Sequence, residues 1–114
     1  MNTSPAITEN RVTIHVQKEG DVTVITIPCK TLRDPQHIQR VGRALSAEVS
    51  TFKGKIRLNC AHLDFISTAG LAELIRFNRK VTAAGGKLTV CGIQQSIYKV
   101  FHRAKFKKVL PVED

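Results

Sequence analysis

The stretch Leu63-Asp64-Phe65-Ile66-Ser67-Thr68-Ala69-Gly70-Leu71 decides how this chain folds. Residues 55–60, before it, alternate polar and apolar side chains as a strand does, and the residues after it repeat apolar side chains near helical spacing. Ser67 and Thr68 are therefore expected at a helix N-terminus, where unpaired backbone N–H groups and the helix dipole favour an added phosphate. The commoner role of such a hydroxyl is to cap the helix.

The composition predicts one cytoplasmic domain without metal or cofactor. The 114 residues suffice to bury roughly two-thirds of the unfolded surface in a single core. Cys29, Cys60 and Cys91 are odd in number, widely spaced and set in apolar runs, which argues against a disulfide framework or a zinc site. We interpret them as buried thiols of a reducing compartment. No segment approaches the roughly 20 apolar residues that a membrane helix needs.

The chain has a large excess of positive charge. Eighteen basic and nine acidic residues give a formal net charge of +9. This charge fits an acidic protein partner, nucleic acid, or merely a well-solvated surface. Arg40 and Arg43 fall on the outer face of a predicted helix. No zinc finger or helix-turn-helix accompanies the charge, so direct nucleic-acid binding is not expected and remains, with an anionic membrane, a minor alternative. Further basic residues crowd the C-terminal end: Lys99, Arg103, Lys105, Lys107 and Lys108.

The pattern along the chain predicts alternating strands and helices. Strands at residues 11–17 and 22–27 form an antiparallel hairpin around residues 19–21. Asp34-Pro35 has the N-cap and first-position proline of a helix that ends near Ser50. Strands follow at residues 55–60 and 87–91. A second helix runs from Ser67 to a glycine cap at residues 85–86, and a third begins at Gln94 or Gln95. Residues 106–112 are a candidate edge strand.

This order, β-β-α-β-α-β-α-β, predicts an α/β fold in a single domain at residues 11–114. Right-handed crossovers would give a mixed sheet of about four or five strands, with the helices packed mainly on one face. Residues 1–10 are polar and are expected to form a flexible N-terminal segment.

The order of elements and residues 64–71 together resemble the STAS domain of the bacterial anti-sigma factor antagonist family. Residues 32–34, 80–88 and 97–101 support the resemblance. The family implies a non-catalytic function in transcription regulation and the stress response. The unphosphorylated antagonist binds an anti-sigma factor that is also a serine kinase, and so frees the sigma factor. Phosphorylation of the loop before the second helix breaks that complex, and a PP2C-type phosphatase restores it.

The resemblance implies a partner-binding loop and two candidate phosphorylation sites. The best-known motif reads Asp-Ser-Ser-Gly-Leu or Asp-Ser-Thr-Gly-Leu, whereas here Ser67 stands at the Asp and Ala69 at the last hydroxyl. Family members with a Ser-Ser-Ala-Gly form use a hydroxyl upstream of the alanine, so Ser67 and Thr68 are both candidates. The kinases' preference for serine favours Ser67. The predicted loop comprises Asp64, Ser67, Thr68, Ala69, Gly70 and Leu71.

Neighbouring residues are expected to support this loop. Phe65 and Ile66 would pack inward to hold it, and Gly70 would permit a close backbone approach. Arg40 and Arg43 of the first helix would extend the partner contact. Asp34 would join them, unless it is only an N-cap.

The sequence offers little for catalysis. The four histidines (His15, His37, His62 and His102) are scattered, and neither a glycine-rich phosphate loop nor a nucleophile elbow is present. The spacing of Cys60 and His62 is typical of packing on one face of a strand. The alternative function is a STAS scaffold or accessory subunit of a signalling complex without regulated phosphorylation. The sequence does not predict an oligomeric state.

Overall fold

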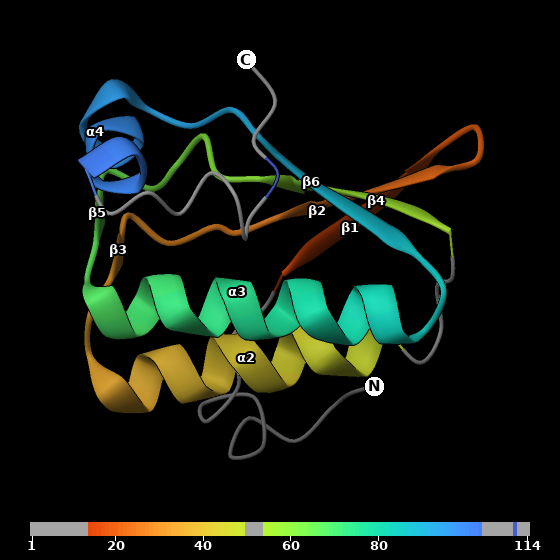
Figure 1. Ribbon diagram of the computed structural model, residues 1–114, viewed down its shortest axis with the longest axis horizontal. Coiled ribbons are helices and arrows are strands. Elements are labelled where there is room, and N and C mark those ends of the chain that lie inside the picture. Colours follow the sequence, from red (N-terminus) through yellow and green to blue (C-terminus); the bar gives the residue numbers. More distant parts are fainter. Residues whose placement is uncertain (1–13, 50–53, 104–110, 112–114) are drawn as a thin grey trace, which may run out of the picture.

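The computed structural model of the chain describes residues 14–49, 54–103 and 111 (Figure 1). Both the predicted N-terminal segment and nearly all of the candidate edge strand lie outside these residues. The elements in chain order are β1 (His15–Glu19), β2 (Val22–Thr26), β3 (Thr31–Leu32), α2 (Pro35–Val49), β4 (Lys55–Asn59), β5 (Phe65–Ile66), α3 (Thr68–Ala83), β6 (Lys87–Cys91) and α4 (Gln95–Arg103).

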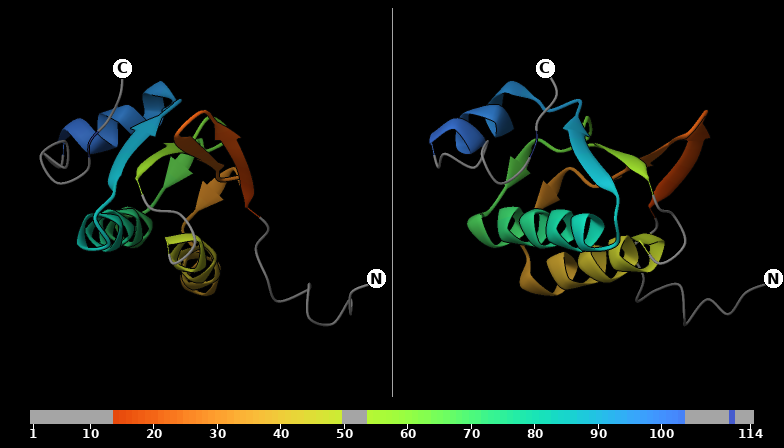
Figure 2. Two further views of the ribbon diagram at one scale, coloured as in Figure 1. Left: turned by 90° about the vertical axis from the view of Figure 1, so that its right-hand side faces the viewer. Right: turned by 45° about the vertical axis from the view of Figure 1, so that its right-hand side comes forward.

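Four strands form the main sheet in the order β1-β2-β4-β6. β1 and β2 pair as an antiparallel hairpin that turns at Gly20 (φ +67°), while β2, β4 and β6 run parallel. Helices α2 and α3 lie side by side against one face of this sheet (Figure 2). The predicted α/β class, with a mixed sheet and helices mainly on one face, is confirmed.

The core lies between the sheet and the two long helices. Alternate residues of the parallel strands face the helices, and Ile25, Leu58 and Val90, which stand opposite one another, are fully buried. Phe77 of α3 is 1% exposed and is the largest of the fully buried side chains in the described part of the chain. Every second residue of the strands and one face of each helix thus contribute side chains to a single hydrophobic layer.

The two long helices run parallel and pack closely against each other. An added Cβ on Gly42 of α2 would meet the end of the Glu73 side chain of α3, which would have to move aside. Further along both helices, Lys80 Nζ donates a hydrogen bond to Ser46 Oγ at 2.8 Å.

The predicted glycine cap of α3 is present. Gly85 has φ +89°, and the N–H groups of Gly85 and Gly86 donate to the carbonyls of Thr82 (3.0 Å) and Val81 (2.9 Å). These two bonds form a Schellman motif, which satisfies carbonyls that the helix end leaves unpaired.

The first strand ends later than predicted. It is described at His15–Glu19, two residues past the predicted end at residue 17, and all five of these residues are exposed. Residues 11–13 of the predicted range lie outside the part of the chain that the structure describes. Within the described part of the chain, β1 has one neighbouring strand, β2, and forms the outer edge of the hairpin (Figure 2). Pro111, of the candidate edge strand, accepts a hydrogen bond from the Val90 N–H at 2.8 Å.

The prediction that Phe65 packs inward is wrong. Phe65 and Ile66 form the short strand β5, in which successive side chains point to opposite sides. Ile66 enters the core at 3% exposure, so Phe65 points outward at 45% exposure.

We expect the two phenylalanines to differ sharply in their contribution to stability. Phe77→Ala should lower the free energy of unfolding by about 3–5 kcal/mol because it leaves a cavity in the core. Phe65→Ala should lower it by less than about 1 kcal/mol, since much of that ring already meets water. Urea denaturation of both variants measures the difference; similar losses would contradict this placement of the rings.

Candidate functional site

Two strand-helix junctions meet at one end of the molecule. The short strands β3 and β5 form a separate two-stranded parallel sheet, in which Thr31 stands opposite Phe65 and Leu32 opposite Ile66. Because β3 leads into α2 and β5 into α3, the two helices begin next to each other (Figure 1). Neither of these short strands was predicted from the sequence.

Ser67 caps α3 and is bound to β3. Its backbone N–H and its hydroxyl both donate to the carbonyl of Leu32, at 2.9 and 3.3 Å. The same hydroxyl oxygen accepts from the Gly70 N–H at 3.1 Å, and the backbone is extended at φ −83°, ψ 169°. This is the geometry of an N-cap. The half-buried hydroxyl of Ser67 is therefore engaged both as donor and as acceptor.

Gly70 permits a close approach, but within the protein. A Cβ at this position would lie 2.6 Å from the Leu32 carbonyl oxygen and 3.0 Å from Cγ1 of Ile66. Gly70 is buried, as is Leu71 at 1% exposure. These two residues of the predicted loop pack inside the protein, where α3 meets β3. They do not form part of the surface of the loop.

Four residues form the surface of the loop, which we call the switch surface: Asp64, Phe65, Thr68 and Ala69. All four are exposed. Thr68 is the first residue of α3, so the unpaired N–H groups and the dipole of the helix lie beside its hydroxyl.

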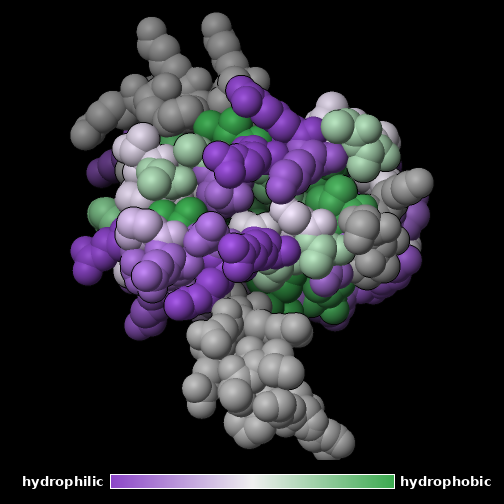
Figure 3. Space-filling view, turned by 90° about the horizontal axis from the view of Figure 1, so that it is seen from below, coloured by the Kyte–Doolittle hydropathy of each residue, from purple (hydrophilic) through white to green (hydrophobic). Residues whose placement is uncertain are grey.

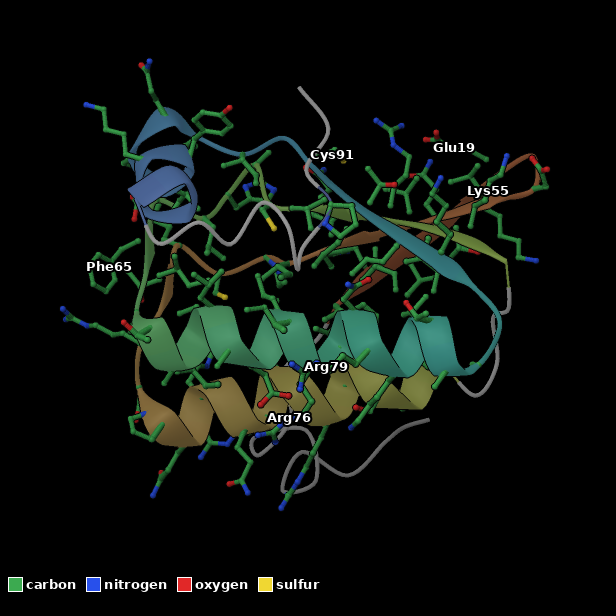
Figure 4. The ribbon with its side chains drawn as sticks, viewed as in Figure 1. Glu19, Lys55, Phe65, Arg76, Arg79 and Cys91 are labelled. Atoms are coloured by element: carbon green, nitrogen blue, oxygen red, sulfur yellow. The ribbon has the colours of Figure 1, made fainter. Side chains whose placement is uncertain are left out.

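The backbone under the switch surface is held from two sides. The N–H groups of Asp64 and Phe65 donate to the Lys30 carbonyl at 2.8 and 3.2 Å. From α4, the Ser96 hydroxyl donates to the Asp64 carbonyl at 3.2 Å. The Phe65 ring points away from the body of the molecule (Figure 4), and the guanidinium of Arg33 lies 5.7 Å from its centre, within cation–π range. Sequence reasoning missed Arg33 and Ser96.

The residues predicted on the first helix lie at different distances from the loop. Asp34 caps α2, since its Oδ1 accepts from the Gln36 N–H at 3.3 Å, and it is exposed at the junction beside β3. Arg40 and Arg43 lie about 9 and 14 Å further along the helix than Asp34, at 1.5 Å per residue. Arg43 is exposed and Arg40 half-exposed. Asp34 thus borders the switch surface, whereas the two arginines lie further along the helical layer.

The three cysteines follow the ends of neighbouring parallel strands or complete them. Cys60 is buried, but Cys29 and Cys91 are half-exposed, so the expectation of buried thiols holds for Cys60 alone. Burial raises the pKa of the Cys60 thiol to about 12, with smaller contributions from Cys91 and Cys29, and burial also raises the pKa of Cys29. Among the residues that the structure describes, no group of His, Cys, Asp and Glu could hold a metal ion. In the same residues, no helix is both long and apolar enough to span a bilayer.

The comparisons with known proteins identify the family. Residues 8–114 match the STAS domain model, and the chain belongs to the STAS domain family. BtrV of Bordetella bronchiseptica, whose name describes it as a candidate anti-sigma factor antagonist, is 28% identical over 68 residues. That match covers 60% of this chain and only 59% of the length of BtrV.

Two solved structures have the same fold. TM1081 of Thermotoga maritima, described as a candidate anti-sigma factor antagonist, gives a TM-score of 0.75 at 12% identity, over 89% of this chain and 86% of that one. The phosphorylated form of SpoIIAA, a Bacillus cell fate determinant, gives 0.62 at 15% identity, over 90% of this chain and 92% of that one. The STAS fold inferred from residues 64–71 and the order of elements is confirmed.

We expect the two neighbouring hydroxyls to differ in their effect on stability. Ser67→Ala should lower the free energy of unfolding by about 1 kcal/mol because it removes the cap of α3 and its bond to Leu32. Thr68→Ala should change it by less than about 0.5 kcal/mol, since its side chain is exposed. Thermal or urea denaturation provides the measurement, and the reverse order would refute the capping role of Ser67.

We expect Cys60 to resist alkylation in the folded protein. With a pKa of about 12, its thiolate is scarce at pH 8, and the side chain is also buried, so maleimide should label it only after unfolding in urea. The folded state holds this proton more tightly than the unfolded chain, whose value is near 9.0. The resulting stability is complete below about pH 9 and is lost as the pH rises towards 12. Mass spectrometry of labelled peptides checks the first expectation; equal labelling of Cys60 before and after unfolding would contradict it.

Proposed function

We propose that this STAS domain is an anti-sigma factor antagonist that acts in the cytoplasm, where sigma factors meet RNA polymerase. In the unphosphorylated state, its switch surface binds an anti-sigma factor that has serine kinase activity, and the sigma factor is freed. The protein acts by binding and not by catalysis. The names of BtrV and TM1081 support the antagonist function. SpoIIAA, which has the same fold and has been solved in a phosphorylated form, supports a phosphorylated state.

The observation that carries the proposal is the unequal engagement of two adjacent hydroxyls. A kinase needs an accessible nucleophile, and the Thr68 side chain is exposed whereas that of Ser67 is half-buried. Phosphorylation of Ser67 would also remove its donor and break the bond to the Leu32 carbonyl. This geometry favours Thr68 as the phosphate acceptor, although the kinases' preference for serine ranks Ser67 first.

A phosphate on Thr68 is compatible with the fold but not with a close-packed partner. It would lie at the N-terminus of α3, where free N–H groups and the helix dipole stabilise negative charge. The modification adds about −1.5 to −2 charges and a bulky, strongly hydrated group. Ala69, next to it, offers a partner a small side chain to pack against. The partner would therefore dissociate while the antagonist stays folded, and a PP2C-type phosphatase would reset it.

The test uses the full chain, ATP and the anti-sigma factor kinase of the same organism. Wild-type protein should gain one phosphate, which intact-mass analysis and fragmentation assign to Thr68. Thr68→Ala should abolish the modification and leave a complex that ATP no longer dissociates, and Thr68→Glu should weaken binding.

Thr82→Ala is the matched control because it makes the same change near the other end of α3, where the hydroxyl donates to the Asn78 carbonyl at 2.9 Å. This variant should be phosphorylated like the wild type. A phosphate on Ser67 would refute the assignment to Thr68. No phosphate at all, from a kinase active on another substrate, would refute the phosphorylation switch itself.

A further inference from the structure

The solvent-facing side of the two long helices carries exposed charge of one sign. Arg43 of α2 and Arg76, Arg79 and Lys80 of α3 are exposed. Both helices are described in full, and neither has an exposed carboxylate: Glu48 and Glu73 are only half-exposed. We call these four cationic residues the basic helical face.

The packing of the helices brings these cations together. Gly42 of α2 lies against Glu73 of α3, and Ser46 lies against Lys80. Arg43 and Arg76 are therefore on neighbouring turns on either side of the same contact line. Figure 4 shows Arg76 and Arg79 over the two helices, and Figure 3, which looks onto this side of the molecule, shows hydrophilic side chains gathered across it.

The acidic groups nearby neutralise little of this charge. Glu73 lies largely beneath the face, with its side chain 15% exposed, and its Oε1 is 3.8 Å from Arg76 Nη1. The other face of the sheet also carries cations, but it includes an exposed carboxylate. There Glu19 stands opposite Val22, in the same row of residues as Lys55 and Lys87. The helical layer differs in having exposed cations and no exposed carboxylate.

The basic helical face is continuous with the switch surface. Helix α3 carries Thr68 and Ala69 at its start, then the exposed Ala72, then Arg76 and Arg79. The three turns from Thr68 to Arg79 span about 16 Å, at 1.5 Å per residue. A protein bound at the switch surface would therefore meet the arginines within the width of one interface.

We propose that the basic helical face docks an acidic polypeptide segment of the partner that binds the switch surface, an inference that rests on the proposed function. Guanidinium groups form paired hydrogen bonds with carboxylates, and Ala69 and Ala72 leave room for the segment. A membrane fits less well, since the exposed residues of α2 and α3 include none of the Trp, Phe or Leu side chains that anchor interfacial helices. Nucleic acid would not explain the continuity with a protein-binding loop.

The test compares two triple variants with equal charge. Arg43→Gln/Arg76→Gln/Arg79→Gln removes the guanidinium groups of the face, and Lys18→Gln/Lys55→Gln/Lys87→Gln removes three exposed cations of the sheet. Each variant lowers the formal net charge by three, from +9 to +6. The probe is labelled poly-L-glutamate of about 20 residues, followed by fluorescence anisotropy at low salt, where the screening length exceeds 10 Å.

The arginine variant should bind the probe at least about tenfold more weakly than the wild type, and the lysine variant less than about threefold more weakly. Equal losses would mean that only net charge matters and would overturn the proposal, as would the absence of wild-type binding. Duplex DNA or anionic vesicles held more tightly than poly-L-glutamate, and lost in the same arginine variant, would overturn the choice of an acidic polypeptide. Unchanged thermal melting of the variants confirms that the exposed substitutions leave the fold intact.

A second measurement uses the kinase partner. Its association rate should fall less steeply with salt for the arginine variant than for the wild type, while phosphorylation of Thr68 at saturating kinase persists. Equal salt dependence would overturn the docking role of the face. A kinase that binds neither protein would defeat the proposed function, whereas the poly-L-glutamate comparison decides the acidic-ligand chemistry of the face separately.

Discussion

The carbonyl group of Leu32 is the constraint on which the rest of the site depends. It accepts hydrogen bonds from both the N–H and the hydroxyl of Ser67, a residue that lies 35 positions further along the sequence. The second bond uses the same side chain that caps α3, so the cap and the anchor of the helix are one group. Gly70 then allows the first turn of α3 to lie against this carbonyl, since a Cβ would stand 2.6 Å from it. The position of Thr68 is therefore set by strand β3.

The long elements could be predicted from the sequence because they extend over enough residues to show a period. Five-residue strands and helices of 15 and 16 residues display alternation or helical spacing. The glycines at positions 85 and 86 mark the end of α3, because glycine is the usual residue just after a helix. The strands β3 and β5 are two residues long, so no period can reveal them. They exist through their mutual pairing. The same pairing turns Ile66 inward and Phe65 outward, which the two adjacent apolar residues alone could not indicate.

The location of the site could be predicted from the sequence, but the different roles of its residues could not. The motif around Gly70 and the strand-to-helix change located both hydroxyls. Which hydroxyl is engaged depends on the backbone, because Ser67 is still extended and directs its Oγ towards Leu32 and Gly70, while Thr68 already belongs to the helix. A preference of kinases for serine carries no information on this geometry. Likewise, the prediction placed Gly70 in a binding loop, whereas the close approach it permits is internal.

Phosphorylation of Thr68 would weaken partner binding at both proposed surfaces. A phosphate there adds about −1.5 to −2 charges at one end of a helix whose outer side bears exposed cations and no exposed carboxylate. Its bulk opposes packing at Ala69, and its charge weakens the attraction of the adjoining face for an acidic segment. The phosphate also repels partner carboxylates directly, over distances shorter than the screening length. Because the helix N-terminus stabilises the added charge, the phosphate should change the stability of the antagonist little. It should mainly weaken the complex with the partner.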